Sequence, residues 1–462
     1  MFRCLLQLIL SLTLLVIVLT TVAILGLFHR AIYDRVWNFP REAEAWEEIR
    51  AMREEPRLQY AWQHYRGVLH SHSHLSHDSD VPFEEILDVL KETDRDFIGM
   101  SDHCDGGKGD YSLQWRGVYD GKLFFPGYEL NNGFMPWGLP SEVVLDCTMD
   151  EDELAAFIDD NGGLLFFAHT ERERRWDLPQ LRGKEIYNIH TDFILENPLI
   201  LGLSKAPSLF VNGSRYPDQS LRLIFKHPTD QIARWDEMNR ERRITGISAN
   251  DSHQNIGIRA RVTEDDTLLI EDTSPKTIAE YPLTGWRWLL ARVLFGRLDP
   301  GKEVYHFQGD PYIVSVNMVS THVLAAELSE AAILDALEQA RAFVAFDAIA
   351  DARGFVFQAE DGDAIAILGE YMPFSSSTNL RGLSPYPVQF EVFRHGEPVY
   401  SYEGREFAWS PPRPGAYRVE ARLNIRGRWV PWVYTNPIYL TEPAGPNATE
   451  TGHLLVSASV GP

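Results

Sequence analysis

An apolar run at the N-terminus constrains this chain most, because its length and lack of charge suit a bilayer. Residues 4–28 carry no charged side chain and are rich in Leu, Ile and Val. A helix needs about 20 such residues to cross the hydrocarbon core. The run is longer than the apolar part of a signal peptide, and no small-residue cleavage site follows it. We therefore expect a retained anchor over residues 1–28, with a cleaved signal peptide as the alternative.

The charges that flank this run favour one orientation. Arg3 precedes the run, whereas Arg30 and Arg35 follow it with Asp34 between them. Lys and Arg bias sets membrane topology, and here the bias is nearly balanced. The very short leading segment favours a cytoplasmic N-terminus. We expect a single-pass membrane protein, attached through residues 4–28, with its body outside the cytoplasm.

Charge and cysteine content exclude several classes of protein. The formal net charge is -23, and so acidic a surface repels phosphate backbones, which argues against nucleic acid as a partner. Of the three cysteines, only Cys104 and Cys147 lie outside the apolar run. Two cysteines do not make a disulfide framework, and the chain has no CxxC zinc pattern. We expect two free thiols, with a single bridge as the alternative.

The rest of the chain divides by its hydrophobic pattern. Residues 29–63 are predicted to form a helical spacer, since they include a charged, helix-prone stretch bounded by prolines. Residues 64–353 alternate strand-like apolar runs with amphipathic helical stretches, which predicts an α/β domain with a parallel sheet covered by helices. Residues 354–441 show short alternating runs between turn residues and predict a small antiparallel β domain. Residues 442–462 have the composition of a disordered tail.

Histidines and acids recur where the strand-like runs of the α/β region end. His70 and His72 follow such a run, and residues i and i+2 of a strand point to the same side. In folds built from alternating strands and helices, active sites collect at the carboxyl ends of the strands. Each residue alone is consistent with a capped turn or a structural histidine, but together they predict one pocket. The other members of the set are His103, Glu129, His169, His190, Asp251 and His253.

Mixed imidazole and carboxylate ligands suit zinc, manganese or iron. Calcium and magnesium prefer shells made only of oxygen. The order of the motifs, an HxH pair followed by an acid, DH, E, H, H and DxH, resembles the PHP (polymerase and histidinol phosphatase) superfamily. Within it, the chain looks similar to stand-alone metallohydrolases with a C-terminal β domain. The resemblance implies an irregular (β/α)7 barrel and two or three divalent metal ions.

The resemblance also implies which residues hold each ion. His70, His72 and Asp251 correspond to the ligands of a first metal, and Glu129 to a carboxylate that bridges it to a second. His169 and His190 correspond to the remaining ligands of the second metal. Asp78, His103 and His253 correspond to ligands of a third metal. His77 and Asp80 are alternatives to Asp78 in the same stretch.

The activity implied by the resemblance is hydrolysis of a small-molecule ester by a metal-activated hydroxide. A phosphoester is the leading substrate class, and a carboxylic ester, carbamate or amide is the alternative. Arginines after two of the histidines favour phosphate slightly: Arg172, Arg174, Arg175 and Arg259. Asp102 and Asn250 neighbour ligands and are candidates to orient imidazoles, although Asp102 is equally explained as a turn acid. A hypothesis from another functional class is a membrane-anchored binding protein whose metal is structural.

One further segment has an unusual composition. Residues 284–297 combine Trp, Leu and Phe with spaced Arg, as in helices that lie at a membrane interface. We expect this helix to pack on the body with its arginines in solvent. Contact with the bilayer is the alternative.

Overall fold

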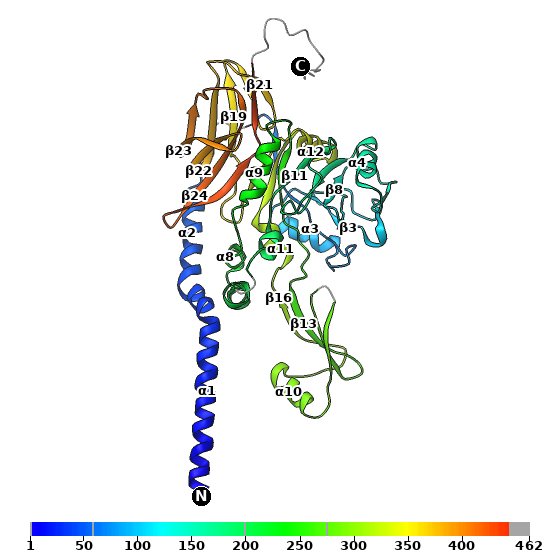
Figure 1. The fold of residues 1–462 in the computed structure, drawn as a ribbon, viewed down its shortest axis with the longest axis vertical. Helices are drawn as coiled ribbons and strands as arrows, with labels where there is room; N and C mark the ends of the chain where they lie inside the picture. The colour runs from blue at the N-terminus through cyan, green and yellow to red at the C-terminus, as the bar shows by residue number, and fades with distance from the viewer. Residues whose placement is uncertain (1, 58–59, 198–199, 274–275, 443–462) are drawn as a thin grey trace.

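The computed structural model describes residues 2–57, 60–197, 200–273 and 276–442. Apart from Glu442, the predicted C-terminal tail lies outside these residues. Figure 1 shows a mixed α/β body from which two parts project at the same end. One is the long N-terminal helix, and the other is a small sheet that carries its own short helix.

The N-terminal helix α1 (Phe2–Tyr33) continues through a π-helical turn, η1 (Asp34–Asn38), into α2 (Phe39–Ala51). Its apolar stretch has the length and composition of a membrane span, and a signal sequence has the same properties. The side chains from Leu10 to Leu25 are exposed. In contrast, α2 buries Phe39 and Trp46 against the body, so the predicted spacer is a docked helix over this range.

The junction between α1 and the body is fixed by buried polar contacts. Asp34 is fully buried and accepts hydrogen bonds from Arg30 Nε at 3.0 Å and from Ser208 Oγ at 2.8 Å. Asn212 Nδ2 donates to the Ala31 carbonyl oxygen at 3.1 Å. Ser208 and Asn212 lie on α7 (Ala206–Asn212), so this helix clamps the last turn of α1.

The largest sheet has 14 strands. At its centre β1 pairs in parallel with β2, which pairs in parallel with β6, while β17 pairs antiparallel with the other edge of β1. Of these strands, β2 and β18 are short, apolar and fully buried, as expected in a covered sheet. Their bounds are β1 (Gln63–Leu69), β2 (Phe97–Gly99), β5 (Gly117–Tyr119), β6 (Lys122–Phe125), β17 (Ser320–Ala325) and β18 (Ala342–Ala345).

A second sheet contributes the other strands that lead to the site. Its order is β12-β11-β10-β8, parallel except for β8, and its strands are β8 (Phe134–Trp137), β10 (Leu164–Phe167), β11 (Leu181–Asn188) and β12 (Thr245–Ala249). The carboxyl ends of β12 and β1 are tied together, because Asp251 N donates to the His70 carbonyl oxygen at 2.7 Å. His72 N donates to the Ser252 carbonyl oxygen at 3.0 Å in the same crossing.

The helices cover these sheets as their apolar spacing predicts. α3 buries Phe83, Ile86 and Leu90 on one face, and α4 begins where Asp150 accepts a hydrogen bond from the backbone N–H of Asp152. The helices around the two sheets are α3 (Phe83–Glu92), α4 (Glu151–Asp160), α5 (Ile189–Ile194), α8 (Pro217–Arg222), α9 (Thr229–Met238), α11 (Tyr312–Met318) and α12 (Glu330–Glu338).

No sheet closes into a barrel among the described residues, which corrects the expected (β/α)7 barrel. The reason is the pairing of β18, which takes β17 on one edge and β25 (Arg428–Thr435) on the other. The sheet therefore runs on into the C-terminal strands instead of curling back to β12. The two sheets cross where β1 and β12 end, and they also touch along β12, where Ser248 N donates to Thr321 Oγ1 of β17 at 3.0 Å.

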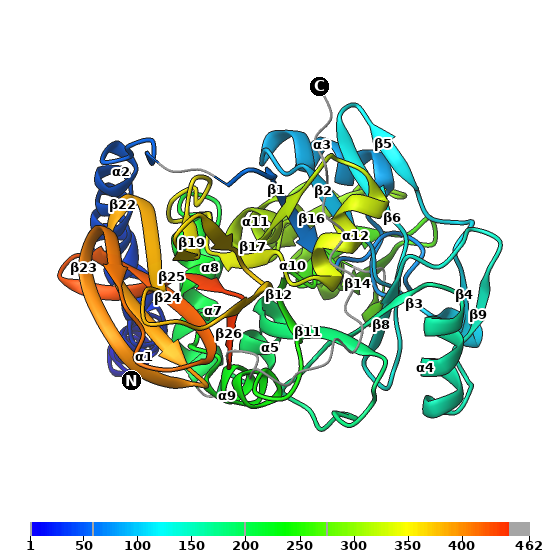
Figure 2. The ribbon, with the colours of Figure 1, turned by 90° about the horizontal axis from the view of Figure 1, so that it is seen from above.

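The C-terminal strands are antiparallel apart from the β21–β26 pair, as the alternating pattern after residue 354 predicts, and they share the large sheet. They are β19 (Val356–Asp361), β20 (Ala364–Ala366), β21 (Tyr371–Pro373), β22 (Asn379–Arg394), β23 (Glu397–Trp409), β24 (Gly415–Ile425), β25 (Arg428–Thr435) and β26 (Ile438–Thr441). Figure 2 shows these strands beside α2, on the opposite side of the molecule from α4.

The projecting sheet has the order β15-β14-β13-β16. Its strands are β13 (Gly257–Val262), β14 (Thr267–Glu271), β15 (Thr277–Pro282) and β16 (Glu303–Gln308), and α10 (Trp286–Phe295) lies between the last two. We call this part, residues 257–308, the projecting module. It leaves the body immediately after the last predicted metal ligands and returns to it at α11.

Cys104 and Cys147 form a disulfide with their Cα atoms 6.4 Å apart, so the expectation of two free thiols was wrong. The bridge joins the segment after His103 to β9 (Val144–Asp146), which pairs with β4 (Lys108–Asp110). Sequence spacing carries no information about this proximity, because it depends on how the long loop between the two cysteines folds.

Candidate metal centre

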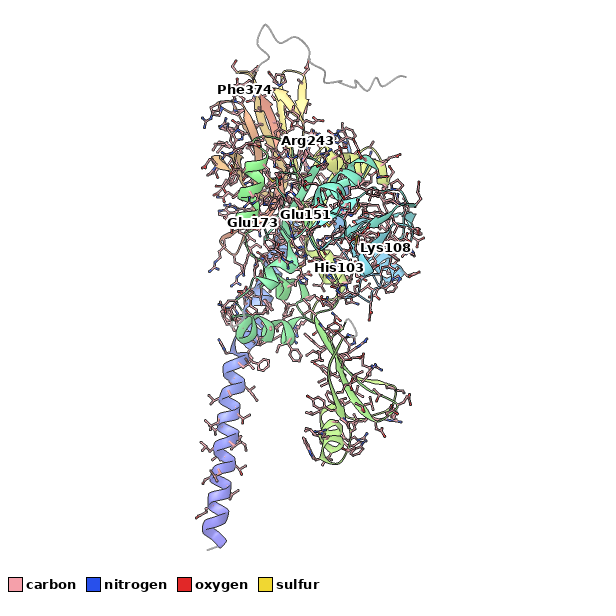
Figure 3. All side chains as sticks on the ribbon, turned by 45° about the vertical axis from the view of Figure 1, so that its right-hand side comes forward. His103, Lys108, Glu151, Glu173, Arg243 and Phe374 are labelled. Atoms are coloured by element: carbon pink, nitrogen blue, oxygen red, sulfur yellow. A yellow bond between two sulfur atoms is a disulfide. The ribbon has the colours of Figure 1, made fainter. Side chains whose placement is uncertain are left out.

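All nine side chains predicted as ligands meet at one place. Seven of them come from the carboxyl ends of β1, β7, β10 and β12 and from β3, and two from the segments after β1 and β11. β3 (Asp102–His103) and β7 (Tyr128–Glu129) pair in parallel, with His103 opposite Glu129. Figure 3 labels His103 at the lower end of the body, above the root of the projecting module. The centre therefore faces the end of the body from which α1 leaves.

Glu129 stands between histidines from different strands. Its Oε2 lies 3.2 Å from His70 Nε2, and its Oε1 lies 3.0 Å from His169 Nε2. Asp251 Oδ1 lies 3.3 Å from both His70 Nε2 and His72 Nε2. Glu129 thus presents separate oxygens to separate imidazoles, which is the arrangement that a bridging ligand requires.

The remaining members form a second group beside the first. Asp78 Oδ2 lies 3.4 Å from His103 Nε2 and 3.3 Å from His253 Nε2. The rings of His253 and His72 stack with their centroids 3.8 Å apart. His190 is at the edge, with its Nδ1 4.0 Å from Asp251 Oδ2.

Four sets of ligand atoms are close enough for each to surround one cation. Within each set the atoms lie within 4.8 Å of one another. The sets are His72, Asp78, His103 and His253; His70, His169 and Asp251; His70, His72 and Glu129; and His190, Asp251 and His253. Their overlap is typical of a cluster whose ions share ligands rather than of isolated structural sites.

Three of these residues have left-handed backbone conformations. The φ angles are 62° at His70, 49° at His169 and 49° at Asp251. A residue other than glycine pays about 1–3 kcal/mol for such a sparsely populated conformation, and these residues cluster at functional sites. Each lies just after its strand, so the turn redirects the side chain into the centre.

Several buried polar atoms in the centre have no hydrogen-bond partner among the described residues. They include His72 Nε2, Asp251 Oδ1, His253 Nε2 and Asp78 Oδ1. A buried polar atom without a partner costs about 1–3 kcal/mol. Lone pairs on imidazole nitrogens and carboxylate oxygens that point to a common space are what a divalent cation requires. The donor set therefore fits zinc, manganese or iron.

The charges in the centre are strongly coupled. Burial alone would raise the pKa of Glu129, but the imidazoles of His70 and His169 hold it well below its usual value. Burial lowers the pKa of His169, yet Glu129 and Glu171 raise it to about 11. The carboxylates thus attract positive charge into a buried space, and bound metal would replace the protons of these imidazoles.

Sequence reasoning missed Glu185, which lies buried on β11. Its Oε1 accepts a hydrogen bond from His70 Nδ1, and its Oε2 accepts one from His169 N at 2.8 Å. Asn188 Nδ2 donates to the same Oε2 at 3.1 Å. This carboxylate orients His70 so that Nε2 faces the centre. β11 also carries Arg182, Lys184 and Asn188, so a glutamate in this stretch gave no local signal of its role.

The two residues predicted to orient imidazoles have different contacts. Asp102 is fully buried and accepts hydrogen bonds from Ser73 N at 2.6 Å and Ser76 Oγ at 3.1 Å. Ser76 Oγ also lies 3.1 Å from His72 Nδ1, so Asp102 reaches that imidazole through Ser76. Asn250 Nδ2 donates to the Ser315 and Val319 carbonyl oxygens, at 2.7 and 3.0 Å, and ties β12 to α11.

The arginines that favoured phosphate are divided between two environments. Arg175 pairs with Asp152 and Asp177, and Arg259 pairs with Glu271 in the projecting module, so both serve as salt-bridge partners. Arg174 Nε donates to the Ala168 carbonyl oxygen at 3.2 Å, directly before His169. Arg172 lines an open cavity of about 980 Å³ that begins at Thr170 and Glu171, next to the centre. Other lining residues are Trp176, Leu195, Gln231, Arg234 and Glu237.

Comparison with known proteins finds similarity only to distantly related solved structures. No family model matches the chain, and no curated protein matches it. A two-domain protein from Bacteroides vulgatus ATCC 8482, containing a predicted PHP-like metal-dependent phosphoesterase, is 12% identical. The match covers 83% of this chain and 98% of that chain, with a TM-score of 0.34. A TM-score this low carries no inference about the function of this chain.

Proposed function

We propose that this protein is a membrane-anchored, metal-dependent hydrolase, and that its reaction is phosphoester hydrolysis. The observation that carries the proposal is the convergence of nine histidines and acids on one centre, with ligand atoms within 4.8 Å of one another in overlapping sets. The order of these residues, which resembles the PHP superfamily, supports the same reaction class. Residues 64–353 would hold the catalytic part, and residues 354–441 would form the β domain.

Two or three zinc, manganese or iron ions would be held by the set already described. His70, His72 and Asp251 would hold the first, with Glu129 shared between the first and the second. His169 and His190 would complete the second, and Asp78, His103 and His253 would hold the third. Such ions, when bound, lower the pKa of coordinated water toward neutrality and offset negative charge on the reacting oxygens.

The chain's own groups would then prepare the site. Glu185 holds His70 and the backbone N–H of His169, so it fixes two ligands from different strands at once. Arg172 and Arg174 stand on the segment after His169, where a guanidinium can bind a substrate phosphate. Glu171 lies 3.4 Å from His169 Nδ1 and lines the open cavity, from which a small ester would approach the centre.

The same centre also suits hydrolysis of a carboxylic ester, carbamate or amide, in which carbonyl carbon replaces phosphorus as the electrophile. The arginines beside His169 favour the phosphoester. A third possibility, a binding protein with structural metal, is disfavoured because structural zinc sites have a closed set of four ligands. Here the ligand sets overlap, and Glu171, which contacts His169, lines an open cavity.

The membrane part of the proposal is a retained anchor over residues 4–28 with the body outside the cytoplasm. The Cys104–Cys147 bridge supports this orientation, because disulfides persist in oxidising compartments and are rare in the cytosol. Protease protection in sealed vesicles tests it. Cleavage of the body by external protease in right-side-out vesicles is the expected outcome, and protection would contradict the orientation.

The activity is tested with matched aryl phosphates and aryl carboxylic esters, each assayed before and after metal removal. We expect hydrolysis of the phosphates that stops on chelation and returns with added metal. Faster hydrolysis of the carboxylic esters would select the alternative chemistry. In a folded His169→Ala variant we expect turnover to be lost, whereas retained turnover would contradict the assignment of His169.

A further inference from the structure

The helix of the projecting module presents its apolar side to solvent. Its five outward residues are between 46% and 74% exposed: Trp286, Leu289, Leu290, Val293 and Leu294. Surface helices of soluble proteins place such residues toward the core. A contiguous apolar patch of this kind marks an interaction surface.

The spacing of these residues makes one continuous stripe. Positions i, i+3, i+4, i+7 and i+8 share a face of a helix, and the five residues follow that pattern. The opposite face holds Ala291 and Phe295, which pack on Ala260, Val262 and Leu283 of the module. Arg287 and Arg292 lie between the two faces, one on each side of the stripe. The helix is thus attached to its sheet by one side and apolar on the other, which corrects the expectation that it packs on the body.

The module lies alongside the proposed membrane anchor. Figures 1 and 3 show α1 and the module projecting from the same end of the body, with α10 at the height of α1. When α1 crosses a bilayer, α10 therefore reaches the same bilayer. A tilt of the spanning helix, about 20° on average, sets how deeply it enters.

Contacts at the base hold both parts in this arrangement. α7 clamps the last turn of α1 through Ser208 and Asn212. Phe210, which also lies on α7, packs its ring against that of Phe307 on β16, with the ring centroids 4.7 Å apart. Gly309 N donates to the Ile256 carbonyl oxygen at 2.7 Å and closes the root of the module.

We propose that α10 is a second membrane contact, which inserts its apolar stripe into the leaflet next to the body. The proposal goes beyond the hydrolase activity and rests on the anchor proposed above. Trp286 has the amphipathic ring that favours the interface, and Arg287 and Arg292 are placed to reach lipid phosphates while their stems cover apolar surface. Residues 284–297 contain no acid, so nothing in this helix repels an anionic headgroup.

The module joins the body close to the catalytic centre, so contact of α10 with the membrane would also affect the position of that centre. β13 begins just after His253, and His103 lies above the module in Figure 3. A chain held only by α1 can tilt about that helix, whereas two attachments restrict the tilt. The second contact would thus hold the centre at a constant height over the bilayer surface.

The test uses the full chain, with Cys4→Ser, in nanodiscs that hold one copy. An environment-sensitive fluorophore is attached to a cysteine placed at Leu289 or, separately, at Val293, and nitroxide-labelled lipids serve as quenchers. A probe at Val16→Cys reports on the anchor. A probe at Ile365→Cys, an equally apolar and exposed position on β20, is the matched control.

We expect the probes at Leu289 and Val293 to shift to shorter wavelength and to lose emission to the quencher, as the Val16 probe does, while the Ile365 probe is unaffected. Quenching at Val16 without quenching at Leu289 and Val293 would overturn the proposal and leave the anchor standing. An absence of quenching at Val16 would overturn the anchor and, with it, this proposal. Shielding of α10 only in discs that hold two copies would assign the stripe to a second copy of the chain and overturn the bilayer contact.

Discussion

Glu185→Gln is the most informative single substitution outside the nine ligands. It keeps the shape of the side chain and removes its charge. Gln retains one oxygen, whereas Glu185 uses both oxygens to accept from His70 Nδ1, His169 N and Asn188 Nδ2. The amide nitrogen would therefore face at least one donor, and either His70 or the turn at His169 would lose its support.

Two estimates of the magnitude agree. Loss of a hydrogen bond to a charged group costs about 1.5–3 kcal/mol. Removal of a group that orients a metal ligand typically weakens metal binding about 10- to 100-fold, which corresponds to about 1.4–2.7 kcal/mol. We therefore expect the metal affinity of the variant to fall about 10- to 100-fold, with the fold retained.

The assay is competition for zinc or manganese between the detergent-solubilised full chain and a chromophoric chelator. Circular dichroism checks that the variant remains folded. Glu271→Gln is the matched control, because Glu271 is also a buried glutamate with charged partners but lies in the projecting module. Equal metal affinity in native and folded Glu185→Gln proteins would refute the reasoning that this carboxylate orients His70.

Three further predictions concern the disulfide, a buried lysine and substrate choice. The Cys104→Ser/Cys147→Ser variant should lose about 4 kcal/mol of unfolding free energy, the chain-entropy value for a separation of 43 residues, and denaturation unaffected by reductant would contradict the bridge. Burial, followed by Arg234, lowers the pKa of Lys184 to about 7, so the unfolded chain binds more protons from about pH 7 to pH 10 and stability should rise across that window. Lys184→Met should flatten this rise in thermal melts, and an unchanged profile would exclude Lys184 as its source. Arg172→Ala should raise KM about tenfold for an aryl phosphate, the loss of about one charged hydrogen bond, and leave KM for an aryl carboxylic ester unchanged; equal effects on both would remove Arg172 from phosphate binding.

Eight of the nine residues of the centre were predictable because each follows a strand-like run, and strand ends are where such folds gather side chains. The ninth, Asp78, was predicted only from the resemblance in motif order. These side chains come together as long as the carboxyl ends of the strands converge. Glu185 was missed because its role depends on the register between β10 and β11, which places its carboxylate beside His169. That register is a property of the folded sheet and leaves no local pattern.

The predictions of a closed barrel and of two free thiols were wrong for a related reason. Closure of a barrel depends on which strand takes the last free edge, and here β25 takes the edge of β18 from a distant part of the chain. The bridge likewise depends on the path of a long loop. The helix around Trp286 was predicted correctly as amphipathic, but composition does not say which face its neighbours cover. In the folded chain the module covers only the side with Ala291 and Phe295.

The central claim is that side chains from five strands and two adjoining segments jointly hold catalytic metal. Elemental analysis of the purified full chain, beside the Asp251→Asn variant, tests it most directly, since Asp251 contacts more of the imidazoles than any other single acid of the set. The account predicts two to three equivalents of zinc, manganese or iron per chain, a lower content in the variant, and a parallel loss of hydrolysis. A native chain without stoichiometric metal, or with hydrolysis that survives complete metal removal, would contradict it.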